Sequence, residues 1–396
     1  MSDLRASEES GAVGAAFRRS RVAVTATFAM HAVMAGTLGP WIPRLKADNG
    51  LDAAGLGLAL TGYAVGLVAG TRLAGPALAR TGGRRVVRAG IPALGAGLAL
   101  LPVANGLGQL AAIFVGFGLA SGLLDVAMNT EAVAVERRFG RRVMSGMHGA
   151  WSASVLAGAA LASVAIAAGI PIGIDLSLVA VVLTLASIPL LRWLPSSEPV
   201  RADAEVKAAS TSDGAIPRVV LLCLVASSAF LSEGVAVEWS AVFLRETLGA
   251  DAGTAGVGVV AFSAGMAASR FAGDRLSARI DPTTLARAGA SLGAIMLAAA
   301  VASESAVVSI VALAIVGVGL GPVVPLAFRA AGGVALGVGR TALGVVVTAG
   351  YVGSIVGPLA VGFTADQAGL QAGFVVPVAA CVVAALASGA IRDRGT

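Results

Sequence analysis

The sequence is poor in cysteine, in histidine and in the motifs of nucleotide and metal chemistry. It holds 2 cysteines and 2 histidines in 396 residues. Cys223 and Cys381 lie far apart in apolar runs, so we expect both in the core, with neither disulfide nor metal spacing. No G-x-x-x-x-G-K-S/T run, no H-E-x-x-H motif and no Cys/His cluster occurs. We therefore predict no catalytic residues, no metal site and no cofactor, and an ATP-driven pump is disfavoured.

Charge is scarce as well. Charged residues make up 13% of the chain and hydrophobic residues 57%, with a mean hydropathy of +0.88. A soluble domain carries about 25% charged and about 45–50% apolar residues, so a globular core cannot bury this much apolar side chain. The formal net charge of +6 comes from arginines between apolar runs instead of from one face or tail, so we predict no nucleic-acid partner. The composition indicates a protein embedded in membrane lipid.

Apolar runs of membrane-spanning length recur along the chain, and a helix needs about 20 apolar residues to cross the hydrocarbon core. The candidate spans are residues 22–42, 55–77, 87–105, 109–133, 144–168, 176–194, 218–243, 255–273, 284–302, 306–327, 341–363 and 372–391. Residues 1–20 are polar and the first run is as long as a full span, so no cleavable signal peptide is expected. The predicted fold class is an all-α integral membrane protein with twelve transmembrane helices.

Lys and Arg residues gather in alternate loops, which sets the predicted orientation. With the N-terminus inside, the outer loops hold only Arg44, Lys46 and Arg245. Both termini are therefore predicted to be cytoplasmic, in a multi-pass protein of a bacterial-type plasma (inner) membrane. The polar stretch 195–217 is typical of a linker. It divides the chain into an N-terminal six-helix bundle, residues 1–194, and a C-terminal six-helix bundle, residues 218–396.

The two halves of the chain resemble each other. Arg72 in GTRLAG corresponds to Arg270 in ASRFAG, and Trp41 corresponds to Trp239, in both cases 198 residues further on. Parallel six-helix repeats around an axis along the membrane normal are the plan of a known transporter fold. The repeat therefore predicts two pseudo-symmetric bundles. We expect Trp41 and Trp239 in the outer aromatic belt.

One loop resembles a family signature. The stretch GPALARTGGRR, from Gly75 to Arg85, is similar to the G-x-x-x-D-R-x-G-R-R loop of the major facilitator superfamily, with Ala79 at the acidic position. In the second half, Asp274 and Arg275 directly follow Gly273 and resemble the acidic and basic pair of the same signature at a shifted position. The acid in span four and the run SGMHGAWS resemble the fucose-permease-type branch. That resemblance implies the major facilitator fold and a proton-coupled symporter of a sugar-like solute. We expect the protein to be a monomer.

Ionisable groups inside the spans are the candidate proton carriers. A charge at the bilayer centre costs about 2.5–3.5 kcal/mol on insertion scales, so such groups usually face a bundle interior or a wet cavity. His31 lies in span one, Asp125 in span four, and Glu233 and Glu238 in span seven. In the superfamily that the chain resembles, spans one, four, seven and ten line the central cavity. The alternatives are a structural ion pair for Asp125, an interfacial position for Glu238 and a backbone carbonyl partner for His31.

Polar and aromatic side chains in the spans are candidate substrate contacts. Asn129 lies four residues after Asp125 and therefore on the same helix face. The candidate substrate-binding residues are Asn129, Trp151, Tyr63, Tyr351 and His148. In span ten, Pro322 and Pro325 predict a broken or bent helix.

A candidate gate follows from the repeat. Its residues are Arg72, Arg270, Asp274 and Arg275. The equivalent placement of Arg72 and Arg270 favours ion-pair donors at the cytoplasmic end, and the alternative is snorkelling of both side chains to the inner interface.

Three functions fit these features. The first is a secondary transporter that moves a small organic solute with protons by rocking of two bundles. The second is a proton-antiporting exporter of an amphipathic or cationic compound, since Asn129 is the only Asn or Gln well inside a span while several carboxylates are present. The third is a non-transporting membrane receptor or sensor.

Overall fold

The computed structural model describes residues 2–141, 143–194, 215–277, 279–334 and 342–392, without the side chains of residues 2–12, 145 and 273–275. Every regular element in these ranges is helical. The first half contains α1 (Ser2–Asp48), α2 (Ala53–Thr81), α3 (Gly83–Leu100), α4 (Leu107–Phe139), α5 (Met144–Ala167) and α6 (Ile172–Leu190). The second half contains α7 (Ala215–Glu246), α8 (Ala252–Ser277), α9 (Pro282–Ala302), α10 (Ala306–Leu320), α11 (Val323–Gly332), α12 (Ala342–Ala368), α13 (Leu370–Gly373) and α14 (Val375–Ala387). Short 3₁₀ turns follow α3, α6 and α14 at Leu101–Val103, Leu191–Trp193 and Ser388–Ile391.

The described residues contain 12 helical segments long and apolar enough to cross a membrane, which confirms the predicted spans. One of them joins α10 to α11 across Gly321 and Pro322. Proline lacks the N–H that would continue the helix ladder, so the predicted break in span ten is confirmed at this point. Residues 195–214 of the predicted linker lie outside the described residues, and its last three residues, 215–217, already belong to α7.

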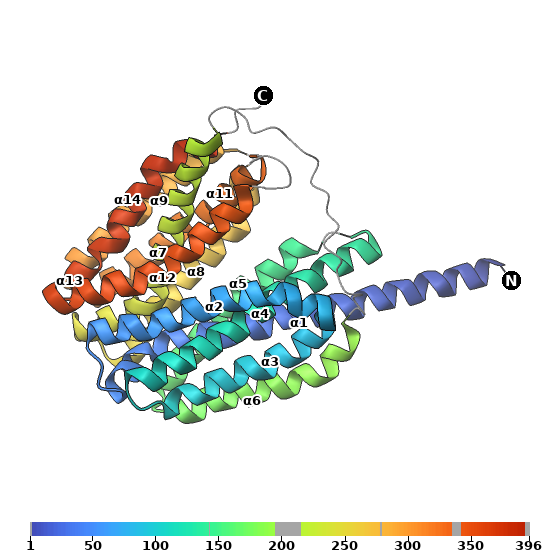
Figure 1. Ribbon diagram of the computed structural model, residues 1–396, viewed down its shortest axis with the longest axis horizontal. Coiled ribbons are helices and arrows are strands. Elements are labelled where there is room, and N and C mark those ends of the chain that lie inside the picture. Colours follow the sequence, from blue (N-terminus) through green and yellow to red (C-terminus); the bar gives the residue numbers. More distant parts are fainter. Residues whose placement is uncertain (1, 142, 195–214, 278, 335–341, 393–396) are drawn as a thin grey trace.

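The helices form two bundles that meet at one end and diverge at the other (Figure 1). Helices α1–α6 form one bundle and α7–α14 the other. Between the bundles, α2 packs on α12, α5 on α8, and α1 on α7. The start of α1 and the end of α14 both lie at the diverging end, which we call the terminal end (Figure 1).

Glycines show where the bundles touch most closely. A Cβ added at Gly57 of α2 would lie 2.4 Å from the carbonyl oxygen of Pro358 on α12, and one at Gly362 would lie 2.6 Å from the carbonyl oxygen of Ala53. Gly75 and Gly344, further along the same two helices toward the terminal end, have no atom within 4 Å of an added Cβ. The backbones of α2 and α12 therefore touch at the end opposite the termini and part toward the terminal end.

Within the first bundle, glycines also let α2 and α4 approach closely. A Cβ at Gly118 would lie 2.1 Å from the carbonyl oxygen of Tyr63, and one at Gly66 would lie 2.1 Å from that of Val115. Small residues at such crossings are the usual basis of helix packing in lipid, where hydrophobicity gives no preference for helix contacts.

This packing yields a stability prediction. Gly118→Val should force α2 and α4 apart, because the new side chain meets backbone that cannot rotate away, and overpacking costs about 1–3 kcal/mol or more. Gly116→Val, on the same helix with no atom within 4 Å, is the matched control. Thermal unfolding of the purified proteins in detergent should show a lower midpoint for Gly118→Val only. Equal midpoints would mean that α2 and α4 can move apart without a loss of thermal stability.

The aromatic-belt prediction for Trp41 and Trp239 is wrong. Their side chains are 5% and 0% exposed, so neither lies at a lipid-facing interface. Trp41 donates from Nε1 to Oδ2 of the buried Asp175 on α6 at 2.7 Å, which explains why it faces inward. Hydropathy indicated the depth of these residues in the membrane and could not indicate the face of the helix.

Candidate functional site

A chain of polar contacts links four helices of the first bundle, α1, α2, α4 and α5. The indole Nε1 of Trp151 donates to Nδ1 of the buried His31 at 3.1 Å. His31 Nε2 lies 2.8 Å from Oγ of Ser121, and that hydroxyl lies 3.3 Å from the hydroxyl of Tyr63. Three residues predicted from the sequence thus meet through a fourth, Ser121, that was not predicted.

The direction of these bonds fixes the state of the imidazole. An indole N–H can only donate, so Nδ1 of His31 is an acceptor and carries no proton. The proton is then on Nε2, which donates to Ser121. In this arrangement His31 is neutral, and the ring lone pair that could bind a further proton, on Nδ1, already accepts from Trp151. Protonation of His31 requires the loss of the Trp151 hydrogen bond.

Asp125 and Asn129 lie together on α4, as their spacing predicted. Asn129 donates from Nδ2 to the backbone oxygen of Asp125 at 2.8 Å, and its distance to the Asp125 carboxylate Oδ1 is 3.4 Å. In the described part of the chain, Asp125 forms no ion pair with Arg, Lys or His. Ser121 precedes Asp125 by four residues, so the same helix-face argument applied one turn earlier would have included it.

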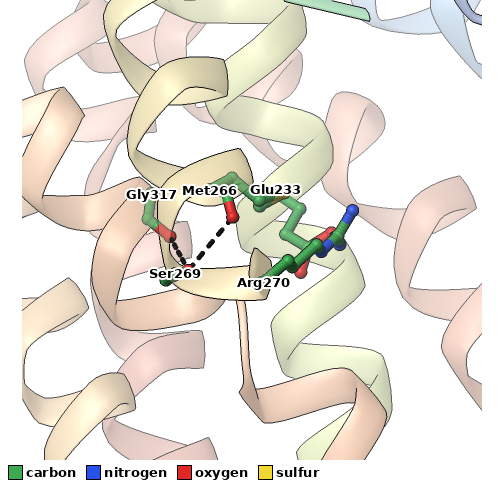
Figure 2. Close-up of polar contacts among 5 residues, drawn as sticks. All are labelled: Glu233, Met266, Ser269, Arg270 and Gly317. Atoms are coloured by element: carbon green, nitrogen blue, oxygen red, sulfur yellow. Dashed lines mark hydrogen bonds and ion pairs between the residues drawn. The ribbon is translucent and has the colours of Figure 1, made fainter. Parts of the chain in front are cut away.

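Glu233 of α7 pairs with Arg270 of α8 at 3.3 Å (Figure 2). The neighbouring Ser269 holds this part of α8, since its hydroxyl donates to the carbonyl oxygen of Met266 at 3.1 Å and lies 3.5 Å from that of Gly317 on α10 (Figure 2). The pair is only partly satisfied, because Glu233 Oε1 and Arg270 Nε are buried without a hydrogen-bond partner among the described residues. Arg270 is also close enough to His148 on α5 for an electrostatic interaction.

A second group of polar residues spans the two bundles. Tyr63 of α2 interacts electrostatically with Asp125 of α4 and with Glu238 of α7. Tyr351 of α12 interacts in the same way with Asp125 and with Tyr63. The carboxylate oxygen Oε2 of Glu238 is buried and makes no hydrogen bond to the described residues. We refer to Asp125, Glu238, Tyr63 and Tyr351 as the acidic cluster.

The predicted gate residues have different surroundings. Arg72 is exposed and donates from Nη2 to Oγ1 of Thr348 at 3.3 Å, which connects α2 to α12 of the other bundle. Arg270, its counterpart in the repeat, pairs inside its own bundle. The side chains of Asp274 and Arg275 lie outside the described residues. Thr348 was not predicted, because nothing local in the sequence marks it as a partner of α2.

A further connection joins the bundles at the opposite end. Lys46, near the end of α1, forms an ion pair with Glu246, the last residue of α7. The two residues are 200 positions apart, close to the 198-residue offset of the repeat. They therefore occupy nearly equivalent places in the two bundles, and a contact between them crosses the pseudo-symmetry axis.

Two six-helix bundles with a partly buried group of polar residues between them are typical of a membrane transporter fold, and known proteins bear this out. The chain matches the Major Facilitator Superfamily model over residues 24–335. An uncharacterised MFS-type transporter of Yersinia pestis is 32% identical, with 85% of this chain and 86% of that protein covered. The uncharacterised transporter y4wD of Sinorhizobium fredii is 30% identical, with 92% and 96% covered. The chain belongs to the major facilitator superfamily.

Solved structures agree on the fold. A mutant of the nucleoside transporter NupG superposes with a TM-score of 0.72 at 13% identity, with 96% of this chain and 100% of that chain covered. A bacterial homologue of the human lysosomal transporter Spinster, in an inward-facing and occupied conformation, has a TM-score of 0.70 at 17% identity, with 94% and 96% covered. The predicted major facilitator fold is confirmed, and the fucose-permease-type branch stays a prediction.

Proposed function

We propose that this protein is a proton-coupled symporter of a small organic solute that works by alternating access. The observation that carries the proposal is Asp125, an acid inside a membrane-spanning helix that has no ion-pair partner among the described residues. An isolated carboxylate in such a site is costly, so uptake of a proton is favoured until water enters. A group with that property can bind a proton on one side of the membrane and release it on the other.

The arrangement of the bundles supports alternating access. One end is closed by backbone contacts of α2 with α12 and by the Lys46–Glu246 ion pair, while the bundles part at the terminal end. With both termini in the cytoplasm of a bacterial inner membrane, as the loop charges predict, this conformation is open to the inside. Transport then requires the closed end to open and the open end to close.

The orientation has a direct test by labelling single cysteines in intact cells, in a variant whose native cysteines are replaced by alanine. Glu304→Cys lies in an exposed loop predicted outside and should react with an impermeant maleimide. Arg80→Cys is exposed at the predicted cytoplasmic end of α2 and should react only after the cells are opened. Labelling of Arg80→Cys in intact cells would reverse the assignment.

The transport mechanism is tested on purified protein in proteoliposomes. A thermal-stabilisation screen against a metabolite library identifies the solute, because a ligand that binds the native state stabilises it by RT ln(1 + [L]/Kd). Symport predicts that an inward proton gradient drives accumulation of that solute and that counterflow occurs without a gradient. Accumulation driven only by the opposite gradient indicates the antiporting exporter. A bound solute without counterflow indicates a receptor.

A further inference from the structure

We infer that the solute is an organic cation whose ammonium group binds at the acidic cluster, with Glu238 as its counter-ion. This inference rests on the proposed transport function and names the chemical class of the solute. It follows from charge, from burial and from the aromatic residues around the two acids.

The acidic cluster holds two acids and, among the described residues, no basic partner for either. Asp125 and Glu238 come from different bundles, yet both lie within electrostatic range of Tyr63. Arg270, a basic side chain in the membrane-spanning part of the second bundle, is already paired with Glu233 at 3.3 Å. Within the described ranges, neither acid of the cluster has an ion pair with a basic side chain. Two acids without a protein cation require positive charge from elsewhere if both are to ionise.

The two acids of the cluster differ in their hydrogen bonds. The Asp125 carboxylate has a donor on its own helix, because Asn129 Nδ2 lies 3.4 Å from Oδ1. Glu238 Oε2 is buried and has no hydrogen-bond partner among the described residues. A buried acceptor without a donor is costly, and an ammonium group supplies both the donor and the charge. In a symporter the two acids then have different cations: Asp125 takes the proton, and Glu238 takes the ammonium group.

Aromatic residues of the cluster bear on the rest of the solute. Tyr63 and Tyr351 place aromatic rings at the cluster, and Tyr351 in turn packs edge-on against Phe230 with ring centroids 6.0 Å apart. Aromatic faces attract ammonium groups, with the largest effect where water is excluded. The polar groups of Trp151, His31 and Ser121 already bond to one another. This favours an apolar or aromatic solute body over one with many hydroxyl groups.

The test is thermal stabilisation of the full-length protein in detergent by matched probe pairs. 2-Phenylethylamine and hexylamine carry an ammonium group at neutral pH, whereas 2-phenylethanol and hexan-1-ol have the same bodies without the charge. The amines should stabilise the wild type, and the alcohols should not. Glu238→Gln should weaken the apparent amine affinity by roughly 10- to 100-fold, the range of a lost charge-assisted hydrogen bond. Glu238→Asp should recover part of it.

Glu304→Gln, which removes an exposed carboxylate in the loop between α9 and α10, is the control and should bind the amines as the wild type does. Equal amine binding by Glu238→Gln and wild type would overturn the inference, as would stabilisation by the alcohols alone or by none of the four probes. The assay needs neither a gradient nor transport. Failure of the transport function, seen as absent counterflow, is therefore distinguishable from failure of the inference.

Discussion

Proteoliposomes containing the Asp125→Asn variant are expected to lose proton-driven accumulation of the solute while solute counterflow continues. Asparagine has nearly the shape of aspartate, but its amide does not bind and release a proton near neutral pH. Its side-chain oxygen can still accept from Asn129, which in the wild type lies 3.4 Å from Asp125 Oδ1. The substitution therefore removes the titratable group and keeps the local hydrogen bonds.

Folding of this variant should be close to that of the wild type. Removal of one partner from a buried ion pair is strongly destabilising, by about 3–5 kcal/mol, because it leaves a charge unpaired. Asp125 has no ion pair among the described residues, so no cation is left behind. Asp366→Asn, an exposed position on α12, is the matched control for expression and for transport.

The measurement is proton flux and counterflow recorded side by side for the wild type and both variants. Only Asp125→Asn should separate the two activities. Full coupled transport by Asp125→Asn would remove this residue from the mechanism and make Glu233 or Glu238 the better proton carrier. Loss of both activities together with low expression would indicate a structural role.

The spans were predictable because the length and apolar composition of a membrane-crossing helix are properties of one continuous stretch of sequence. Each crossing helix needs about 20 apolar residues whatever its neighbours are, so a single run is informative by itself. The ends of the helices are less constrained: α4 continues past the predicted end of its span at residue 133 to Phe139. There Oε1 of Glu136 accepts hydrogen bonds from the backbone N–H groups of Val143 and Met144 at 2.7 and 3.0 Å, which connects the end of α4 to the residues that follow it.

Contacts between the candidate site residues were predictable only where the residues share a helix. Asp125 and Asn129 came together through their spacing of four. The partners of Arg72 and Trp41 lie 276 and 134 positions away, on helices whose relative rotation no local pattern specifies. The wrong placement of Trp41 and Trp239 has the same origin, because a tryptophan near a membrane boundary can face lipid or a neighbouring helix. The repeat indicates which helices correspond and does not indicate which side chains meet.

The second large effect is expected at the closed end, where a cross-link between Lys46→Cys and Glu246→Cys should reduce transport to background. The wild-type ion pair joins α1 to α7 across the two bundles, and its side chains are 12% and 36% exposed. Ion pairs at the surface contribute only about 0.2–1 kcal/mol, so this partly exposed pair biases the closed state and cannot hold it. Charge reversal at either residue should therefore change transport only a few-fold, whereas a covalent bridge stops the opening altogether.

The design follows from the geometry. A direct disulfide requires Cα atoms about 4.4–6.8 Å apart, and Lys and Glu side chains reach much further than Cys, so a reducible bis-methanethiosulfonate linker is needed. The native Cys223 and Cys381 are replaced by alanine first. The control pair is Arg44→Cys with Asp48→Cys, since those residues form an ion pair at 2.8 Å within α1 alone. Bridging them leaves the two bundles free.

The expected result is loss of counterflow on cross-linking of the Lys46–Glu246 positions, recovery on reduction, and unchanged counterflow in the control pair. Recovery on reduction shows that the loss came from the bridge and not from the substitutions. Full counterflow in cross-linked protein would mean that α1 and α7 stay together throughout the cycle at this end. The two bundles would then have to rearrange elsewhere, and alternating access by separation of these helix ends would be wrong.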